Sequence, residues 1–172
     1  MKWFSHSLIA GATTAVVSPP LVPVAVLGST APDWLEWVIN ALGGRVGHRT
    51  VTHYLSVRAV FFGFFLFLWD FQAIGASFAY GGLSHILCDA LTITGVPFGP
   101  WSDRRFHLFG GRLRTGDPAE YGIAFGVVAI CAAFFIVLGA SGWYPFFYDW
   151  SGLYNTGVID GAEWRANRFR FF

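Results

Sequence analysis

The chain has 172 residues, a formal net charge of +1, 55% hydrophobic residues and only 12% charged residues. An ordinary soluble domain carries roughly a quarter charged residues, so this composition excludes a typical soluble monomer and favours a lipid-facing surface. With a near-neutral net charge, the chain lacks the basic surface that drives binding to duplex nucleic acid. We therefore expect no such partner.

Four apolar segments follow one another along the chain, at residues 8–31, 54–69, 71–91 and 121–142. Only the last is an uninterrupted stretch of the roughly 20 residues that a bilayer-spanning helix needs. We therefore predict an all-α integral membrane bundle of about four apolar helical segments, some of them re-entrant. Residues 1–142 form its membrane-embedded domain, and residues 143–172, rich in aromatic residues and arginine, form an interfacial tail.

The first apolar segment is interrupted by Pro19 and Pro20. Proline lacks an amide donor and clashes with the preceding helical turn, so each half of the segment is too short to cross a bilayer. This pattern predicts a re-entrant hairpin that turns at the two prolines. A single kinked span is the alternative.

The second and third segments are separated by Asp70 and Gln72. These polar groups are costly in hydrocarbon unless they have partners or lie at an interface, so they indicate the turn of a second hairpin. The alternative is one tilted span over residues 58–80 with Asp70 inside it. Residues 40–49 and 95–118 are expected to be polar, glycine-rich connections.

Histidines and carboxylates form three local patterns. In the third segment, His85 and Asp89 lie four residues apart, so one helical face presents both to a common cation, although a hydrogen bond between them explains the spacing equally well. His48 and His53 precede the second segment, where His53 could also be a capping or packing residue. Asp33 ends the first segment, where it could instead be the N-cap of a short helix.

Hairpin geometry brings these patterns together. A turn at Pro19 and Pro20 returns His6 and Asp33 to one membrane face. A second hairpin, whose arms of about 15 residues are roughly 23 Å long, brings His53 and His85 to one face as well. Imidazole and carboxylate ligands suit zinc, and more than four of them indicate two or more ions, as in many enzymes that cleave phosphoesters. Glu120, at the entry of the last span, is expected to join this cluster.

A known family has a similar set of motifs. Residues 5–121 resemble the bacterial inner-membrane metal-dependent hydrolases of YdjM type through His6, Pro32-Asp33, His48-Arg49, Thr52-His53, residues 83–92 followed by Gly95-Val96-Pro97, Thr115-Gly116 and Glu120. That family is thought to be distantly related to the zinc-dependent phospholipase C and single-strand nuclease superfamily. Where many members have a further Asp-His pair, this chain has Leu35-Glu36, so one ligand is lost or replaced by Glu36. The resemblance implies five metal ligands, His6, Asp33, His53, His85 and Asp89, and extends to His48 and Glu120.

The remaining polar residues suggest catalytic and substrate-binding roles. We expect Glu36 or Glu120 to accept a proton from an activated water, with His48 in the same catalytic set. Arginines of the 100–115 loop match phosphate oxygens, although a positively charged membrane-flanking loop has the same composition. The arginines expected to bind the phosphate of the substrate are Arg104, Arg105 and Arg112.

The expected function is hydrolysis of a phosphoester, with a phospholipid headgroup as substrate, one to three zinc ions as cofactor and manganese as the alternative metal. Amide or ester hydrolysis, and a metal-binding structural subunit of a membrane complex, are the other candidates. Expected partners are membrane lipid, other membrane proteins or further copies of the chain. Basic residues on the site face favour a multi-pass protein of the bacterial inner membrane with its site at the cytoplasmic face.

Overall fold

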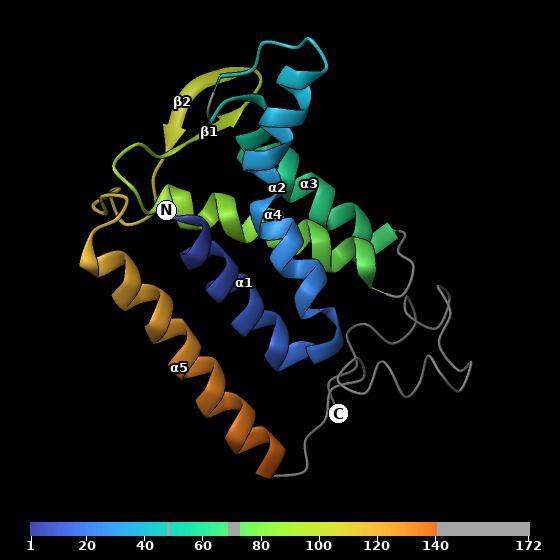
Figure 1. The fold of residues 1–172 in the computed structure, drawn as a ribbon, viewed down its shortest axis with the longest axis vertical. Coiled ribbons are helices and arrows are strands. Elements are labelled where there is room, and N and C mark those ends of the chain that lie inside the picture. Colours follow the sequence, from blue (N-terminus) through green and yellow to red (C-terminus); the bar gives the residue numbers. More distant parts are fainter. Residues whose placement is uncertain (48, 69–72, 141–172) are drawn as a thin grey trace.

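The computed structural model describes residues 1–47, 49–68 and 73–140, which are mainly helical (Figure 1). Within these residues, helices alternate with short helical turns, and one strand pair precedes the last helix. The elements in chain order are α1 (Trp3–Val17), η1 (Pro19–Leu21), α2 (Val22–Ala41), η2 (Val51–His53), α3 (Leu55–Gly63), η3 (Phe64–Leu68), α4 (Ile74–Ala90), β1 (Val96–Gly99), β2 (Ser102–Phe106) and α5 (Pro118–Ala140).

The first two helices form the hairpin that the double proline predicts. The break falls at Ser18, whose backbone is extended, and Pro19 and Pro20 then start the short turn η1. Helices α1 and α2 pack against each other, so the single kinked span is wrong. Helix α2 continues through Pro32, which removes one amide donor without ending the helix. Asp33 therefore lies inside α2, and the alternative of an N-cap at this position is wrong.

The second and third apolar segments form two helices that also pack against each other, α3 with η3 and then α4. Because both lie side by side, the alternative of one tilted span over residues 58–80 is wrong. Helix α4 follows Ala73, which has a left-handed backbone with φ 56°. The predicted turn at Asp70 lies outside the described residues.

Helices α2 and α4 approach so closely that their backbones touch at two glycines. A Cβ atom on Gly28 would lie 2.1 Å from the carbonyl oxygen of Phe78, and one on Gly81 would lie 2.1 Å from that of Ala25. Only glycine leaves room for this crossing, as in tightly packed membrane helices. The crossing fixes the relative positions of the two helices that carry Asp33 and His85.

The strand pair corrects the expectation of an all-α fold with a loop at residues 95–118. Strands β1 and β2 are antiparallel, with Val96 opposite Phe106, and their register is irregular between Pro97 and Gly99. The strands are short and Pro97 lacks an amide donor, so the alternating pattern of a regular strand is weak in the sequence. After β2, the Leu108 amide donates to the Ala90 carbonyl at 2.8 Å, which ties the hairpin to the end of α4.

One described helix is long and apolar enough to cross a membrane. It is α5, over Pro118–Val137, and little of it is buried inside the protein. Helix α5 lies alongside α1 (Figure 1), while α3 and η3 form a shorter apolar stretch over Leu55–Leu68. Of the four predicted apolar segments, one is a candidate membrane span by its length and composition within the described residues. The predicted tail at 143–172 lies outside those residues.

Candidate metal centre

The five residues predicted as metal ligands come together from four elements. Four of them are buried and Asp33 is half-buried. Two hairpins make this possible, because each returns the chain to the side of the bundle from which it started. The ligands are His6 on α1, Asp33 on α2, His53 on η2, and His85 and Asp89 on α4.

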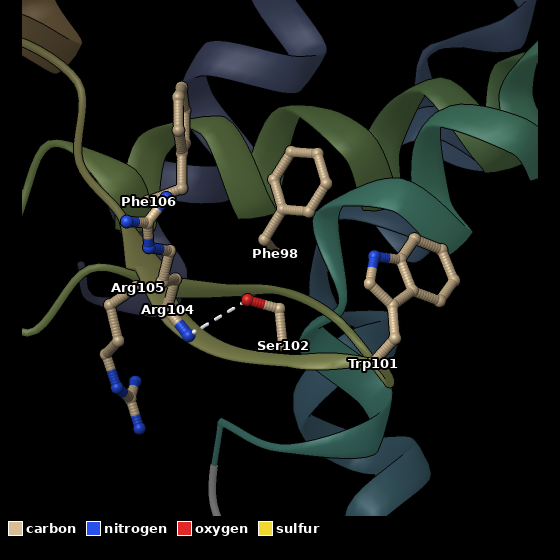
Figure 2. Close-up of a pocket in the computed structure, with 6 residues that line it drawn as sticks. All are labelled: Phe98, Trp101, Ser102, Arg104, Arg105 and Phe106. Atoms are coloured by element: carbon tan, nitrogen blue, oxygen red, sulfur yellow. Dashed lines mark hydrogen bonds between the residues drawn. The ribbon is translucent and has the colours of Figure 1, made fainter.

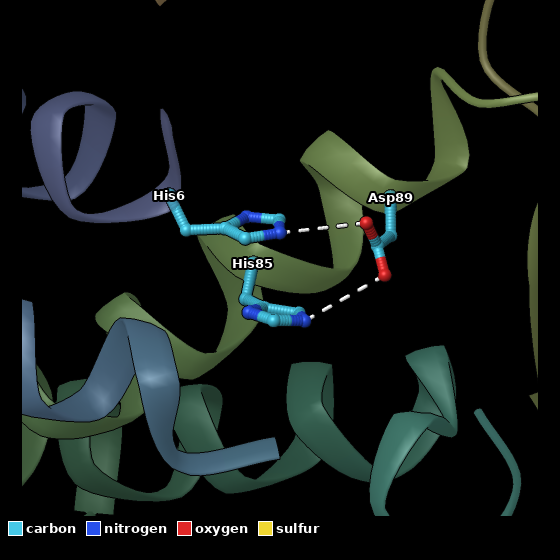
Figure 3. A group of neighbouring side chains, drawn as sticks. All are labelled: His6, His85 and Asp89. Carbon is cyan, nitrogen blue, oxygen red and sulfur yellow. Dashed lines mark ion pairs between the residues drawn. The ribbon is translucent and has the colours of Figure 1, made fainter. Parts of the chain in front are cut away.

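These side chains form two adjoining groups that share His85. One group contains His6, His85 and Asp89 (Figure 3), and the other contains Asp33, His53 and His85; in each, the ligand atoms lie within 4.8 Å of one another. The Nε2 atom of His85 lies 3.6 Å from Asp89 Oδ2 and 3.7 Å from Asp33 Oδ1. His85 therefore faces one carboxylate from each group.

Hydrogen bonds set the direction of two imidazole rings. His85 Nδ1 lies 2.6 Å from the Ser29 carbonyl oxygen and donates to it, which turns Nε2 toward the carboxylates of Asp33 and Asp89. His53 Nδ1 lies 3.0 Å from Glu36 Oε1, while its Nε2 lies 3.3 Å from Asp33 Oδ1. Burial lowers the pKa of His53, which favours the neutral form that binds metals.

Several buried atoms of the centre make no hydrogen bond among the described residues. They include His6 Nε2, His85 Nε2 and Asp33 Oδ1. Buried polar atoms in proteins nearly always have a partner, and a cation between these nitrogen and oxygen atoms satisfies several of them at once. The donor set of imidazoles and carboxylates is also the one that zinc takes in the absence of thiolates. The residues therefore fit a divalent metal ion.

Asp89 has a positively charged group beside each of its carboxylate oxygens. Its Oδ1 atom contacts the α-amino group of Met1 and lies 3.4 Å from His6 Nε2. Its Oδ2 atom lies 3.1 Å from the guanidinium of Arg49. The sequence does not indicate this contact, because Arg49 and Asp89 are 40 positions apart and only the tertiary structure brings them together.

Glu36 supports the centre from behind His53. It is buried, and its Oε1 atom accepts hydrogen bonds from the Arg49 amide at 3.0 Å and the Thr52 hydroxyl at 2.8 Å. The same oxygen lies 3.0 Å from His53 Nδ1. Glu36 thus contacts His53, one of the predicted ligands.

Glu120 lies outside both ligand groups. It is fully buried and accepts hydrogen bonds from the Lys2 amide at 2.7 Å, the Ser5 hydroxyl at 2.6 Å and the Gly116 amide at 2.7 Å. These bonds join the start of α1 to the start of α5. The structure therefore gives Glu120 contacts that hold the fold together beside the centre.

The predicted arginines of the 100–115 loop belong to neither ligand group. His48 lies outside the described residues, and the side chain of Arg112 is exposed. Arg104 and Arg105 line a cavity of about 540 Å³ on the strand pair, together with aromatic residues (Figure 2). The other lining residues are Phe98, Trp101, Ser102 and Phe106.

A comparison with known protein families identifies one whose model spans these motifs. The family model described as "YdjM inner membrane protein" matches residues 1–144, a range that covers both ligand groups and helix α5. No curated protein and no solved structure matches the chain. The matched range covers most of the sequence, so the chain belongs to the YdjM inner membrane protein family.

Proposed function

We propose that this protein is a membrane-bound, metal-dependent hydrolase that cleaves a phosphoester, with a phospholipid headgroup as its substrate. The observation that carries the proposal is the pair of buried ligand groups that share His85. Neighbouring metal sites suit phosphoester cleavage, because one ion can hold the nucleophile while the other neutralises charge on the phosphoryl oxygens.

The two groups divide the ligands between them. His6, His85 and Asp89 would hold one ion, and Asp33 and His53 would hold a second with His85 at the boundary. The imidazole and carboxylate set favours zinc, with manganese as the alternative. Bound there, the metal supplies a Lewis acid that makes water a better nucleophile near neutral pH.

We assign separate roles to the two glutamates. Glu36 orients His53 through its contact with Nδ1, and its exchange of a proton with water is a secondary role. Glu120 holds the starts of α1 and α5 together beside the ligands. His48 is kept as a third candidate for proton transfer because it neighbours Arg49 in the chain.

The membrane supplies the substrate in this proposal. Helix α5 is the candidate span, and the basic residues of the site face favour a cytoplasmic location for the centre in a multi-pass protein. Arg104 and Arg105 lie beside exposed aromatic residues on the strand pair, a combination suited to the headgroup region. We include Arg112 in this basic surface because its side chain is exposed in the same loop.

The test combines metal analysis with a lipid assay. The protein is purified in detergent without chelator, its metal is measured by elemental mass spectrometry, and it is incubated with phospholipid vesicles. The proposal expects bound zinc or manganese and release of diacylglycerol or phosphatidic acid, both lost in His85→Ala and kept in His107→Ala, whose side chain is exposed and outside both groups.

Other results decide between the remaining functions. Release of fatty acid or peptide products would replace the phosphoesterase with an amide or ester hydrolase. Absence of metal after reconstitution with zinc would overturn the hydrolase and favour a structural subunit. That alternative has its own support in the exposed aromatic side chains of α3 and η3, including Phe61, Phe64 and Phe67, which could pack on a partner or a second copy.

A further inference from the structure

The guanidinium of Arg49 is held beside the metal ligands by contacts on two sides. One terminal nitrogen lies 3.1 Å from Asp89 Oδ2. The other donates to Thr94 Oγ1 at 2.7 Å and to Thr92 Oγ1 at 3.3 Å. The Arg49 side chain is only 11% exposed, so it is a fixed part of the centre and not a mobile surface cation.

The backbone of Arg49 is also constrained. Its φ is 57°, in the left-handed region that residues other than glycine seldom adopt and that costs them free energy. The amide of this strained residue donates to Glu36 Oε1 at 3.0 Å, the same oxygen that lies beside His53 Nδ1. The carboxylate that orients a ligand therefore also sets the position of the arginine.

The guanidinium keeps a donor for a further acceptor. Its Nε atom is buried and makes no hydrogen bond among the described residues. An arginine presents five N–H groups in a planar fork that matches two oxygens of a phosphoryl group. Thr94 beside it is exposed, and the Thr94 carbonyl accepts from Arg105 at 3.5 Å, so this side of the centre opens toward the basic strand pair.

We propose that Arg49 binds an anionic phosphoryl oxygen of the substrate next to the metal centre. The inference rests on the proposed function, because it names the part of the substrate that the centre recognises. Arg49 holds a fixed positive charge within reach of Asp89, and a phosphoryl oxygen is the acceptor that its remaining donor lacks. Inorganic phosphate and a phospholipid headgroup share this chemistry.

The test measures binding, not turnover. Inorganic phosphate and a short-chain phosphatidic acid are titrated separately into the purified protein in detergent, before and after metal removal by a chelator. The variants are Arg49→Gln, Arg49→Lys and the control Arg45→Gln, whose arginine is exposed. Losing a charge-assisted hydrogen bond and its charge is expected to weaken binding of both ligands about tenfold or more in Arg49→Gln. Arg45→Gln is expected to bind like the wild type.

Arg49→Lys keeps the charge and most of the side chain, so it serves if Arg49→Gln does not fold. It is expected to bind phosphate several-fold more weakly than the wild type, because an ammonium lacks the planar fork. Affinity within twofold of the wild type in either Arg49 variant overturns the inference. Tighter binding of phosphatidic acid than of phosphate identifies the headgroup as the source of the anion.

Metal content separates this inference from the function on which it rests. If the wild type binds metal and the Arg49 variants keep it while phosphate affinity falls, both proposals are supported. If metal is absent but phosphate binding still depends on Arg49, the inference stands and the hydrolase falls. If metal is present and phosphate binding is independent of Arg49, only the inference is overturned.

Discussion

The imidazole rings of His6 and His85 are stacked, with centroids 3.7 Å apart and planes 14° from parallel. The stack brings both rings to the same carboxylate, since His6 Nε2 lies 3.4 Å and His85 Nε2 lies 3.6 Å from an oxygen of Asp89. The stack joins α1 to α4, and His85 in turn faces Asp33 on α2. His85 is thus the residue through which the two ligand groups are coupled.

His85→Ala is expected to remove more metal than His6→Ala. His85 belongs to both groups, whereas His6 belongs to one, so the first variant weakens both sites and the second leaves the Asp33 group intact. Elemental mass spectrometry of the purified variants measures the metal-to-protein ratio. His107→Ala, with an exposed histidine outside both groups, should keep the wild-type ratio. Equal losses in His85→Ala and His6→Ala would contradict two sites coupled through one residue.

Glu36→Gln is expected to lower metal affinity about 10- to 100-fold, as removal of residues that orient metal ligands typically does. The glutamine keeps the size of the side chain but lacks the negative charge that holds the Nδ1 hydrogen of His53. Competition with a chelator measures the affinity. Asp117→Asn is the matched control, because Asp117 is an exposed carboxylate outside both groups. Full metal affinity with lost turnover would instead identify Glu36 as the proton acceptor.

The proximity of the five residues in the two groups could be predicted because its signals are local or nearly so. Pro19 and Pro20 end a helix by their own chemistry, and the turn they create returns the chain to His6. The spacing of His85 and Asp89 likewise needs only one helix. Hairpins with arms of similar length then bring the histidine and carboxylate patterns to one side of the bundle. This step can be predicted from the lengths of the helices, without side-chain packing.

The parts that sequence reasoning missed depend on contacts between distant residues. Arg49 contacts Asp89 and Thr94, and neither contact has a local signal. Glu120 lies at the start of the last span, but it accepts hydrogen bonds from the Lys2 amide and the Ser5 hydroxyl, both more than 100 residues away in the sequence, and from the nearby Gly116 amide. Every residue type except proline has a backbone N–H, so no sequence pattern reveals such a bond.

Glu120→Ala is expected to lower the free energy of unfolding by about 2 to 4 kcal/mol, because it leaves three buried or part-buried donors without an acceptor. The donors are the amides of Lys2 and Gly116 and the hydroxyl of Ser5. Chemical unfolding in detergent, followed by tryptophan fluorescence, measures the loss. Folded protein should still bind metal, since Glu120 lies in neither ligand group. Wild-type stability combined with lost turnover would return Glu120 to the catalytic residues.

Gly28→Ala and Gly81→Ala are each expected to lower the free energy of unfolding by about 1 to 3 kcal/mol or more. This is the usual cost of forcing an extra methyl group into a packed interior. Each Cβ would lie 2.1 Å from a backbone oxygen of the facing helix, so α2 and α4 must move apart. That movement separates Asp33 from His85. The midpoint of thermal unfolding and the metal content should therefore both fall.

Gly122→Ala is the matched control for this pair of substitutions. Gly122 lies in α5, and a Cβ atom there meets nothing within 4 Å among the described residues. Alanine is favoured over glycine inside a helix by about 0.5 to 1 kcal/mol, so this variant should be as stable as the wild type or slightly more so. Equal stability of all three variants would mean that α2 and α4 are not in backbone contact. Loss of metal from Gly28→Ala and Gly81→Ala at unchanged helicity would instead show that this helix crossing sets the geometry of the metal centre.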